Sequence, residues 1–144
     1  LLNVRTFLDH NRMWEMPKRI TRNISTSTGA FVEKGKRISN NLVEDSLLEH
    51  LLKWKPYVEK FGLLIIELHT VSPTIIADNL GKTAATAYDA THGFSDQFII
   101  EVDVFQRIAR SAGLHPDPKY FTKFPNNELA TVSVNLLKGS SIHE

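Results

Sequence analysis

The chain has 144 residues, which is enough for one domain with a core of its own and too few to expect two. Hydrophobic residues make up 42% and charged residues 23%, both ordinary values for a globular domain. The formal net charge of +1 gives no reason to expect a nucleic-acid partner. The absence of cysteine excludes disulfides, thiolate metal ligands and a cysteine nucleophile.

No apolar run approaches the ~18–20 residues that span a bilayer, and the N-terminal residues do not have the pattern of a signal peptide. We therefore expect no membrane partner and a cytoplasmic location. The chain lacks an initiator methionine and begins in an apolar stretch that is typical of a strand. We interpret residues 1–137 as the C-terminal half of a longer domain and residues 138–144 as a tail. A sheet cut at its first strand would expose an unpaired edge, so we expect this chain alone to aggregate or dimerise.

The first forty residues predict a strand and a hairpin. Residues 1–8 form a short apolar run, which is typical of a buried strand, and the run ends in the polar cluster 9–12. Residues 29–39 are typical of a small hairpin, because Gly35 can supply the positive φ that its turn needs.

The middle of the chain predicts a helix followed by the clearest strand. Asn40 or Asn41 is the expected cap of the helix, Pro56 is expected to break or kink it, and Gly62 suits its C-terminal end. The continuous apolar run in residues 63–68 predicts a strand that is buried on both faces.

The remaining elements are two helices and a last strand. The Ser-Pro pair at 72–73 is expected to open a helix that runs toward Tyr88. Helical periodicity recurs at the end of residues 98–112 and is closed by Gly113. Residues 129–137 alternate apolar and small polar side chains, which predicts an antiparallel strand at or near a sheet edge.

This order of elements predicts an α/β fold, with a mostly parallel sheet, a terminal antiparallel strand and a small hairpin insertion. In open sheets of this kind, ligands bind beyond the carboxyl ends of the strands. That rule selects Asp9 and His10, which follow the first strand, and Glu67 to His69, at the end of the second.

Glu67 and His69 are the predicted catalytic residues. Alternation places both side chains on the same side of the sheet, and His69 stands at the strand end, where a general base is needed. Histidine titrates near pH ~6.5, which suits that role. A carboxylate in an apolar strand needs a partner, so the alternative is structural: Glu67 pairs with Arg5 or another cation of the adjacent strand.

Asp9, His10 and Arg12 are the predicted substrate-binding residues, because they end a buried-looking strand at the ligand edge of the sheet. Arg12 can hold a carboxylate or phosphate through two parallel hydrogen bonds. The alternative is a solvated turn in which Asp9 accepts hydrogen bonds from the backbone.

His92, Asp96 and Gln97 form the candidate metal site. An imidazole nitrogen with carboxylate and amide oxygens suits Fe(II) or Mn(II) better than zinc. The alternative is that Ser95 or Asp96 caps the following helix and that His92 is a loop residue.

Three stretches carry a family resemblance: residues 4–12 (VRTFLDHNR), Glu67-Leu68-His69 and residues 88–98 (YDATHGFSDQF). Together with the order of elements, they resemble the second half of a class I S-adenosylmethionine-dependent methyltransferase, in particular the methyltransferase domains of polyketide assembly lines such as the apratoxin loading module. The similarity runs from Val4 to about Leu137. The resemblance implies S-adenosylmethionine as cofactor, and some relatives of that family hold a mononuclear metal that positions an acyl substrate.

The chain departs from that family in one respect. Class I methyltransferases hold the donor at a glycine-rich loop after the first strand and at an acidic residue after the second, and neither motif occurs here. We therefore expect the donor-binding half of the same domain to lie upstream.

The resemblance implies transfer of a methyl group to carbon or oxygen of an acyl-type substrate, either a small molecule or one bound to a carrier protein. In that reaction His69 or the His92 cluster would remove or polarise a proton of the acceptor. Two other classes remain open: a non-catalytic, methyltransferase-derived module that binds a partner or shapes an assembly, and a metal-dependent enzyme of other chemistry, such as a decarboxylase.

Overall fold

The computed structural model describes residues 1–91 and 96–139. Its elements are β1 (Asn3–Thr6), β2 (Val32–Glu33), β3 (Lys36–Arg37), α1 (Asn40–Val58), β4 (Leu63–Leu68), α2 (Pro73–Asp78), α3 (Ala85–Thr91), α4 (Val102–Ser111), β5 (Leu114–Pro116), the 3-10 turn η1 (Pro118–Tyr120), β6 (Thr122–Phe124) and β7 (Val132–Gly139). Within this part of the chain, no helix has both the length and the apolar character needed to cross a membrane.

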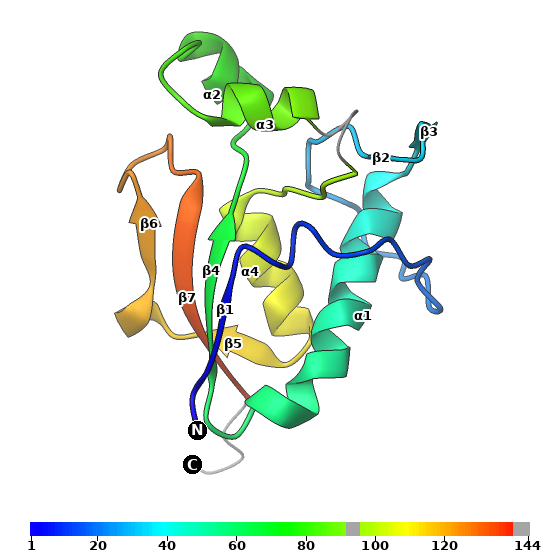
Figure 1. Cartoon of the computed structure of the whole chain (residues 1–144), viewed down its shortest axis with the longest axis vertical. Helices are drawn as coiled ribbons and strands as arrows, with labels where there is room; N and C mark the ends of the chain where they lie inside the picture. Colours follow the sequence, from blue (N-terminus) through cyan, green and yellow to red (C-terminus); the bar gives the residue numbers. More distant parts are fainter. Residues whose placement is uncertain (92–95, 140–144) are drawn as a thin grey trace.

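A mixed sheet is the centre of the fold (Figure 1). Its strands are ordered β1-β4-β7-β5, and β6 also pairs with β7. Strands β1 and β4 are parallel, whereas β7 is antiparallel to β4, β5 and β6. The α/β class, the parallel strand pair, the antiparallel last strand and the hairpin are therefore as predicted. Strand β7 lies next to the edge of the sheet, between β4 and β5, which agrees with the prediction of a strand at or near an edge. One detail differs: antiparallel pairs outnumber the parallel pair among the described strands.

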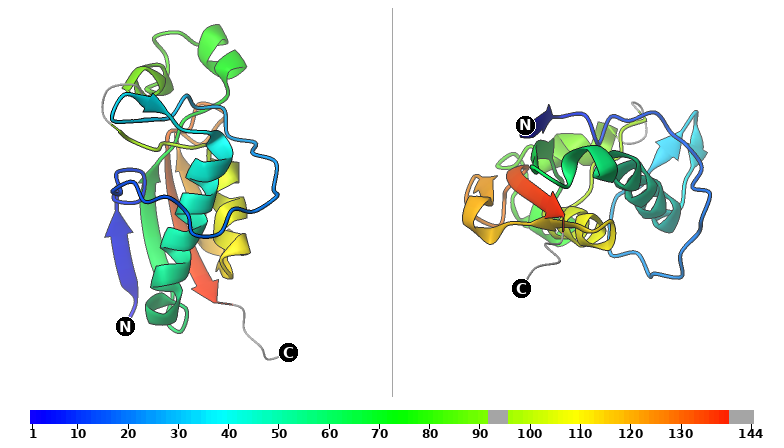
Figure 2. Two further views of the ribbon diagram at one scale, coloured as in Figure 1. Left: turned by 90° about the vertical axis from the view of Figure 1, so that its right-hand side faces the viewer. Right: turned by 90° about the horizontal axis from the view of Figure 1, so that it is seen from below.

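Helices α1 and α4 lie together against one face of this sheet (Figure 2). Along β4, Leu63 and Ile65 face the helices and are fully buried, whereas Leu64 and Ile66 on the other face are only half-buried. The prediction that this strand is buried on both faces is therefore wrong for the described part of the chain. The first strand is not buried either, because β1 is an edge strand and Val4 is 57% exposed.

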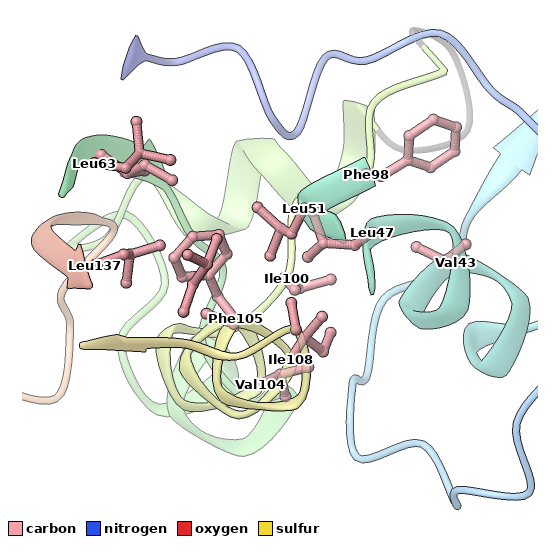
Figure 3. Packing of buried hydrophobic residues seen from close by; sticks show 14 of the residues in the cluster. Val43, Leu47, Leu51, Leu63, Phe98, Ile100, Val104, Phe105, Ile108 and Leu137 are labelled. Atoms are coloured by element: carbon pink, nitrogen blue, oxygen red, sulfur yellow. The ribbon is translucent and has the colours of Figure 1, made fainter. Parts of the chain in front are cut away.

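The core lies between the helices and this covered face (Figure 3). Its members come from α1, β4, α4 and β7 and from the extended segment that precedes α4, and they include Val43, Leu47, Leu51, Leu63, Phe98, Val104, Phe105, Ile108 and Leu137. Full burial of one such side chain contributes about 1.5–3 kcal/mol. This packing fixes the position of both helices relative to the sheet.

Helix α1 differs from its prediction at both ends. Its N-cap is Ser39, whose hydroxyl accepts a hydrogen bond from the Leu42 N–H, and not Asn40 or Asn41. The helix runs through Pro56 as far as Val58. A proline so near the end disturbs few backbone bonds, and burial of Val58, which is 2% exposed, favours the helical path.

Helix α2 begins as predicted and ends early. The Ser72 side chain accepts a hydrogen bond from the Ile75 N–H, and Pro73 occupies the first turn. Asn79 has a φ of −131°, outside the helical range, and Gly81 has a φ of 74°, so the chain turns before α3 begins. The single helix predicted toward Tyr88 is therefore two short helices.

The predicted turns at Gly35 and Gly113 are confirmed. Lys34 and Gly35 both have positive φ, at 47° and 77°, as the two central residues of a type I′ hairpin turn require. Gly113, with a φ of 77°, follows α4 and lets the chain reverse into β5.

Candidate functional site

Glu67 joins the carboxyl ends of the two parallel strands. Its Oε2 accepts hydrogen bonds from the backbone N–H groups of Asp9 and His10 at 2.9 and 3.0 Å. Its Oε1 accepts one from the Leu68 N–H at 2.7 Å and forms an ion pair with His10 Nδ1. Glu67 is 2% exposed, and both of its oxygens are saturated. The predicted meeting of the two strand ends is therefore confirmed, and the side chain that pairs with Glu67 is His10 rather than Arg5.

Asp9 is the centre of a second ion-pair cluster. Its Oδ1 lies 3.0 Å from the Arg5 guanidinium and accepts a hydrogen bond from His50 Nε2 at 2.9 Å. Asp9 is 1% exposed, and Arg5 also stacks over the Trp54 ring at 4.4 Å. These contacts tie the end of β1 to helix α1. The sequence had assigned no role to His50.

Arg12 is directed into the protein. It donates to the carbonyl oxygens of Asp9 at 2.8 Å and Val43 at 3.1 Å, and it lies 3.4 Å from the Ser46 hydroxyl. Its guanidinium also stands 5.2 Å from the centre of the Phe98 ring. Burial lowers the pKa of Arg12 to about 10. The residue thus holds the loop after β1 against α1, and the role of this loop in binding substrate stays a prediction.

His69 is fully buried, and both of its ring nitrogens are hydrogen-bonded. Nδ1 donates to the carbonyl of Ile100 at 3.1 Å, so Nε2 is the acceptor and takes a hydrogen bond from the Ser133 hydroxyl at 2.6 Å. The ring packs edge-on against Phe105, with 5.6 Å between the centroids. Burial lowers the pKa of His69 to about 4, so the ring is neutral at ordinary pH. In this arrangement no nitrogen of His69 is available to a substrate, and its role as a base stays a prediction.

A chain of hydrogen bonds leads from His69 to the side of α4. Asn135 donates to the Ser133 hydroxyl at 3.0 Å, and Gln106 donates to the Asn135 side-chain oxygen at 2.9 Å. Gln106 is half-buried and borders a large cavity. The buried histidine is therefore linked through three side chains to a surface that a ligand can reach.

Two cavities at this end of the sheet differ greatly in size. The void beside Glu67 and His10 measures about 10 Å³, which is about the room of one water. The second, about 450 Å³, lies at the carboxyl end of β4. Its lining includes polar groups of Thr28, Thr70, Ser72 and Gln106 and apolar groups of Val71 and Ile75. The second is large enough for a small-molecule ligand, as is a third cavity of about 320 Å³ beside Arg5, Arg12 and His50.

Glu101 borders this larger cavity and was not singled out in the sequence. It is the N-cap residue of α4 and is 8% exposed, and its backbone forms an isolated parallel β-bridge with Thr70. Its Oε1 accepts hydrogen bonds from the N–H and the hydroxyl of Thr28, while its buried Oε2 has no hydrogen-bond partner among the described residues. Burial raises the pKa of Glu101. The signal was present, because the run in 98–101 (FIIE) repeats the apolar-then-Glu pattern of 64–67 (LIIE) that drew attention to Glu67.

The candidate metal site falls only partly within the described residues. His92 lies outside the described residues. Asp96 is exposed and accepts a hydrogen bond from the Lys34 N–H at 3.2 Å, and Gln97 is half-buried. In the part of the chain that is described, no group of three or more histidine, aspartate and glutamate side chains is arranged to hold a metal ion. The described residues therefore give no support to Fe(II) or Mn(II).

The described residues also do not fit S-adenosylmethionine as a bound donor. A donor site needs a glycine-rich loop that follows a strand and opens a helix. Gly35 lies in the hairpin turn, Gly62 and Gly113 follow helices, and Gly81 lies between α2 and α3. After β4, the helix is opened by the Ser-Pro pair at 72–73.

A mixed α/β sheet whose parallel strands end at a polar cluster and a ligand-sized cavity is compatible with part of a Rossmann-like domain, the class to which class I methyltransferases belong. A family model described as the AprA MT2-like domain matches residues 1–135. The chain therefore belongs to this family of methyltransferase domains, of the apratoxin type. A comparison with curated proteins gave no match.

Proposed function

We propose that this chain forms the acceptor side of an S-adenosylmethionine-dependent methyltransferase that methylates carbon or oxygen of an acyl-type substrate in a polyketide-like pathway. The methyltransferase family supports the reaction class. The position of the cavity, at the carboxyl end of β4, supports an acceptor site there, because open α/β sheets bind ligands beyond the strand ends.

The cavity of about 450 Å³ is the observation that carries this proposal. Ligand pockets measure roughly 300–1,000 Å³ and combine an apolar lining with a few fixed polar groups. Here Val71 and Ile75 supply apolar surface, and Thr70 and Gln106 supply polar groups. We call the Glu67 carboxylate, together with the backbone N–H groups of Asp9 and His10 that donate to it, the Glu67 clamp. This clamp holds the neighbouring strand ends in place, and with them the adjacent wall of the cavity.

In this proposal the methyl donor is held by residues outside those described, in an upstream half of the same domain. The residues of this chain bind and orient the acceptor, which is either a small molecule or an acyl group on a carrier protein. The enzyme acts in the cytoplasm.

The test uses the protein together with its natural upstream sequence. It is incubated with methyl-labelled S-adenosylmethionine and with short acyl thioesters, and labelled product is followed by mass spectrometry. We expect donor binding in a calorimetric titration and label in the acyl product. If the protein with its upstream sequence gives no binding heat with S-adenosylmethionine, the proposal is wrong.

The second candidate is a non-catalytic module that binds a partner or shapes an assembly. The observation in its favour is that His69, Glu67 and Arg12 are all engaged in hydrogen bonds within the protein. The same titration separates the two candidates, because such a module binds acyl ligands or partners without binding the donor.

A further inference from the structure

We propose that the cavity beside Glu101 binds a ligand that carries an ammonium group on a short apolar chain, with the Glu101 carboxylate as its anchor. This adds an ammonium group to the acyl-type acceptor, and it rests on the proposed function only in identifying the ligand as the acceptor. The binding itself requires neither the donor nor methyl transfer.

The Glu101 side chain is held in one orientation. Thr28 holds its Oε1 through both the backbone N–H, at 2.9 Å, and the hydroxyl. Oε2 is buried and has no hydrogen-bond partner in the described part of the chain, and Glu101 is one of the residues that line the cavity. Because Oε1 is held on two sides, the carboxyl group cannot turn to satisfy Oε2 elsewhere. A ligand that enters the cavity is the available source of the missing hydrogen-bond donor.

The lining of the cavity carries a net negative charge. It contains three carboxylates, those of Glu101, Asp103 and Glu128, against one lysine, Lys123. This is a formal excess of two negative charges, which attracts cations and repels anions. An ammonium group brings the opposite charge and three N–H donors, and charge-assisted hydrogen bonds of this kind are the strong ones.

Part of the lining of the cavity is apolar. Val71, Ile75 and Phe121 border the same cavity as Glu101. Short alkyl groups gain free energy when they leave water for such surface. The lining therefore fits a cation that has an apolar body, and not a fully hydrated metal ion.

The pH dependence distinguishes this ligand from a neutral carbonyl compound. Burial raises the pKa of Glu101 above its ordinary value. The charged groups that share the cavity are Asp103 on α4, Lys123 on β6 and Glu128 between β6 and β7. An ammonium ligand needs the ionised carboxylate, so its affinity rises with pH until Glu101 is ionised. A neutral carbonyl ligand without an ammonium group would accept a hydrogen bond from the protonated carboxyl, and its affinity would fall over the same range of pH.

The experiment is a calorimetric titration of the whole chain with n-butylammonium, n-butanol and butyrate. We expect n-butylammonium to bind at least about tenfold more tightly than n-butanol, and butyrate to give no binding. Glu101→Gln should weaken the cation by about tenfold or more and remove the rise in affinity with pH. Asp103→Asn should weaken the binding of n-butylammonium less than Glu101→Gln does. Glu15→Gln is the matched control, since it removes the same charge from an exposed residue outside the cavity.

The inference is overturned if Glu101→Gln binds n-butylammonium like the wild type, if butyrate or n-butanol binds as tightly, or if affinity falls as pH rises. A thermal melt of each variant shows whether it is folded before the titration is interpreted. Cation binding without donor binding by the protein with its upstream sequence would refute the proposed function and leave this inference standing. Methyl transfer by a protein that does not bind n-butylammonium would refute this inference and leave the proposed function standing.

Discussion

Two buried glutamates with the same local sequence pattern have different surroundings in this domain. Glu67 follows the run Leu-Ile-Ile, and Glu101 follows Phe-Ile-Ile. Glu67 is surrounded by three backbone N–H groups and His10, so both of its oxygens are saturated. Glu101 accepts hydrogen bonds on one oxygen only, its other oxygen has no partner among the described residues, and the residue lines a cavity of about 450 Å³.

The difference shows how a buried carboxylate can be assigned to structure or to ligand binding. Burial of a charge is costly in both places, so burial alone does not separate the two roles. What separates them is whether the protein itself supplies all the hydrogen-bond partners. The region around Glu67 does so and acts as a structural clamp, whereas the region around Glu101 leaves a place that a ligand can fill.

The largest expected effect is at the clamp. Glu67→Gln puts an amide where backbone N–H groups and His10 need an acceptor, and breaking a buried pair of this kind costs about 3–5 kcal/mol. Guanidinium unfolding measures the free energy of unfolding of the variant and of the wild type. Glu15→Gln, at an exposed ion pair with Lys53, should show no measurable change. A loss below about 1 kcal/mol in Glu67→Gln would mean that the clamp is not structural.

The next effect is the pH dependence that comes from His69. Its pKa is about 4 in the folded chain against 6.5 for a free histidine, so the unfolded chain binds the proton more readily between these values. The contribution of His69 is complete above pH 6.5 and is lost as pH falls toward 4, by about 3 kcal/mol in total.

Unfolding curves at a series of pH values test this contribution. His69→Gln should lose less stability than the wild type over the same range of pH. Equal losses in His69→Gln and the wild type would contradict the assignment.

A smaller effect is expected at Thr28, which holds Glu101. Thr28→Val removes the hydroxyl that donates to Oε1, at a cost of about 1–2 kcal/mol, and should raise the pKa of Glu101 further. Unfolding gives the change in stability, and a carboxyl-carbon NMR titration gives the change in pKa. Thr122→Val, at an exposed position on β6, is the control. An unchanged pKa would show that the hydroxyl does not stabilise the carboxylate.

The smallest effect is expected at Glu101 itself. Because Gln can still accept hydrogen bonds from Thr28, Glu101→Gln should change the free energy of unfolding by less than about 1 kcal/mol. The raised pKa of Glu101 means that the wild type loses stability as pH rises through that pKa, and the glutamine variant should not. A loss as large as that of Glu67→Gln would remove the contrast between the two glutamates.

Much of the fold was predictable because local signals are strong where the backbone needs a special residue. The turn at Gly35, the Ser-Pro start of α2 and the end of α4 at Gly113 were all found from sequence. The path of α1 through Pro56 was not, because it depends on packing between distant parts of the chain.

The site was predictable to the extent that it follows the strand ends. The carboxyl-edge rule brought Asp9 and His10 to Glu67 correctly. The partners of His69, which are Ile100 and Ser133, are 31 and 64 residues away in the chain, and no local pattern reveals them.

The central claim is that ligands bind beside Glu101 and not beside Glu67. The most direct measurement is a two-dimensional ¹H–¹⁵N NMR titration of the chain with n-butylammonium. The account predicts that the amide signals of Thr28, Thr70 and Val102 shift progressively, while those of His10 and Leu68 stay in place. Shifts confined to His10 and Leu68, or no shifts at any of the five amides, would contradict it.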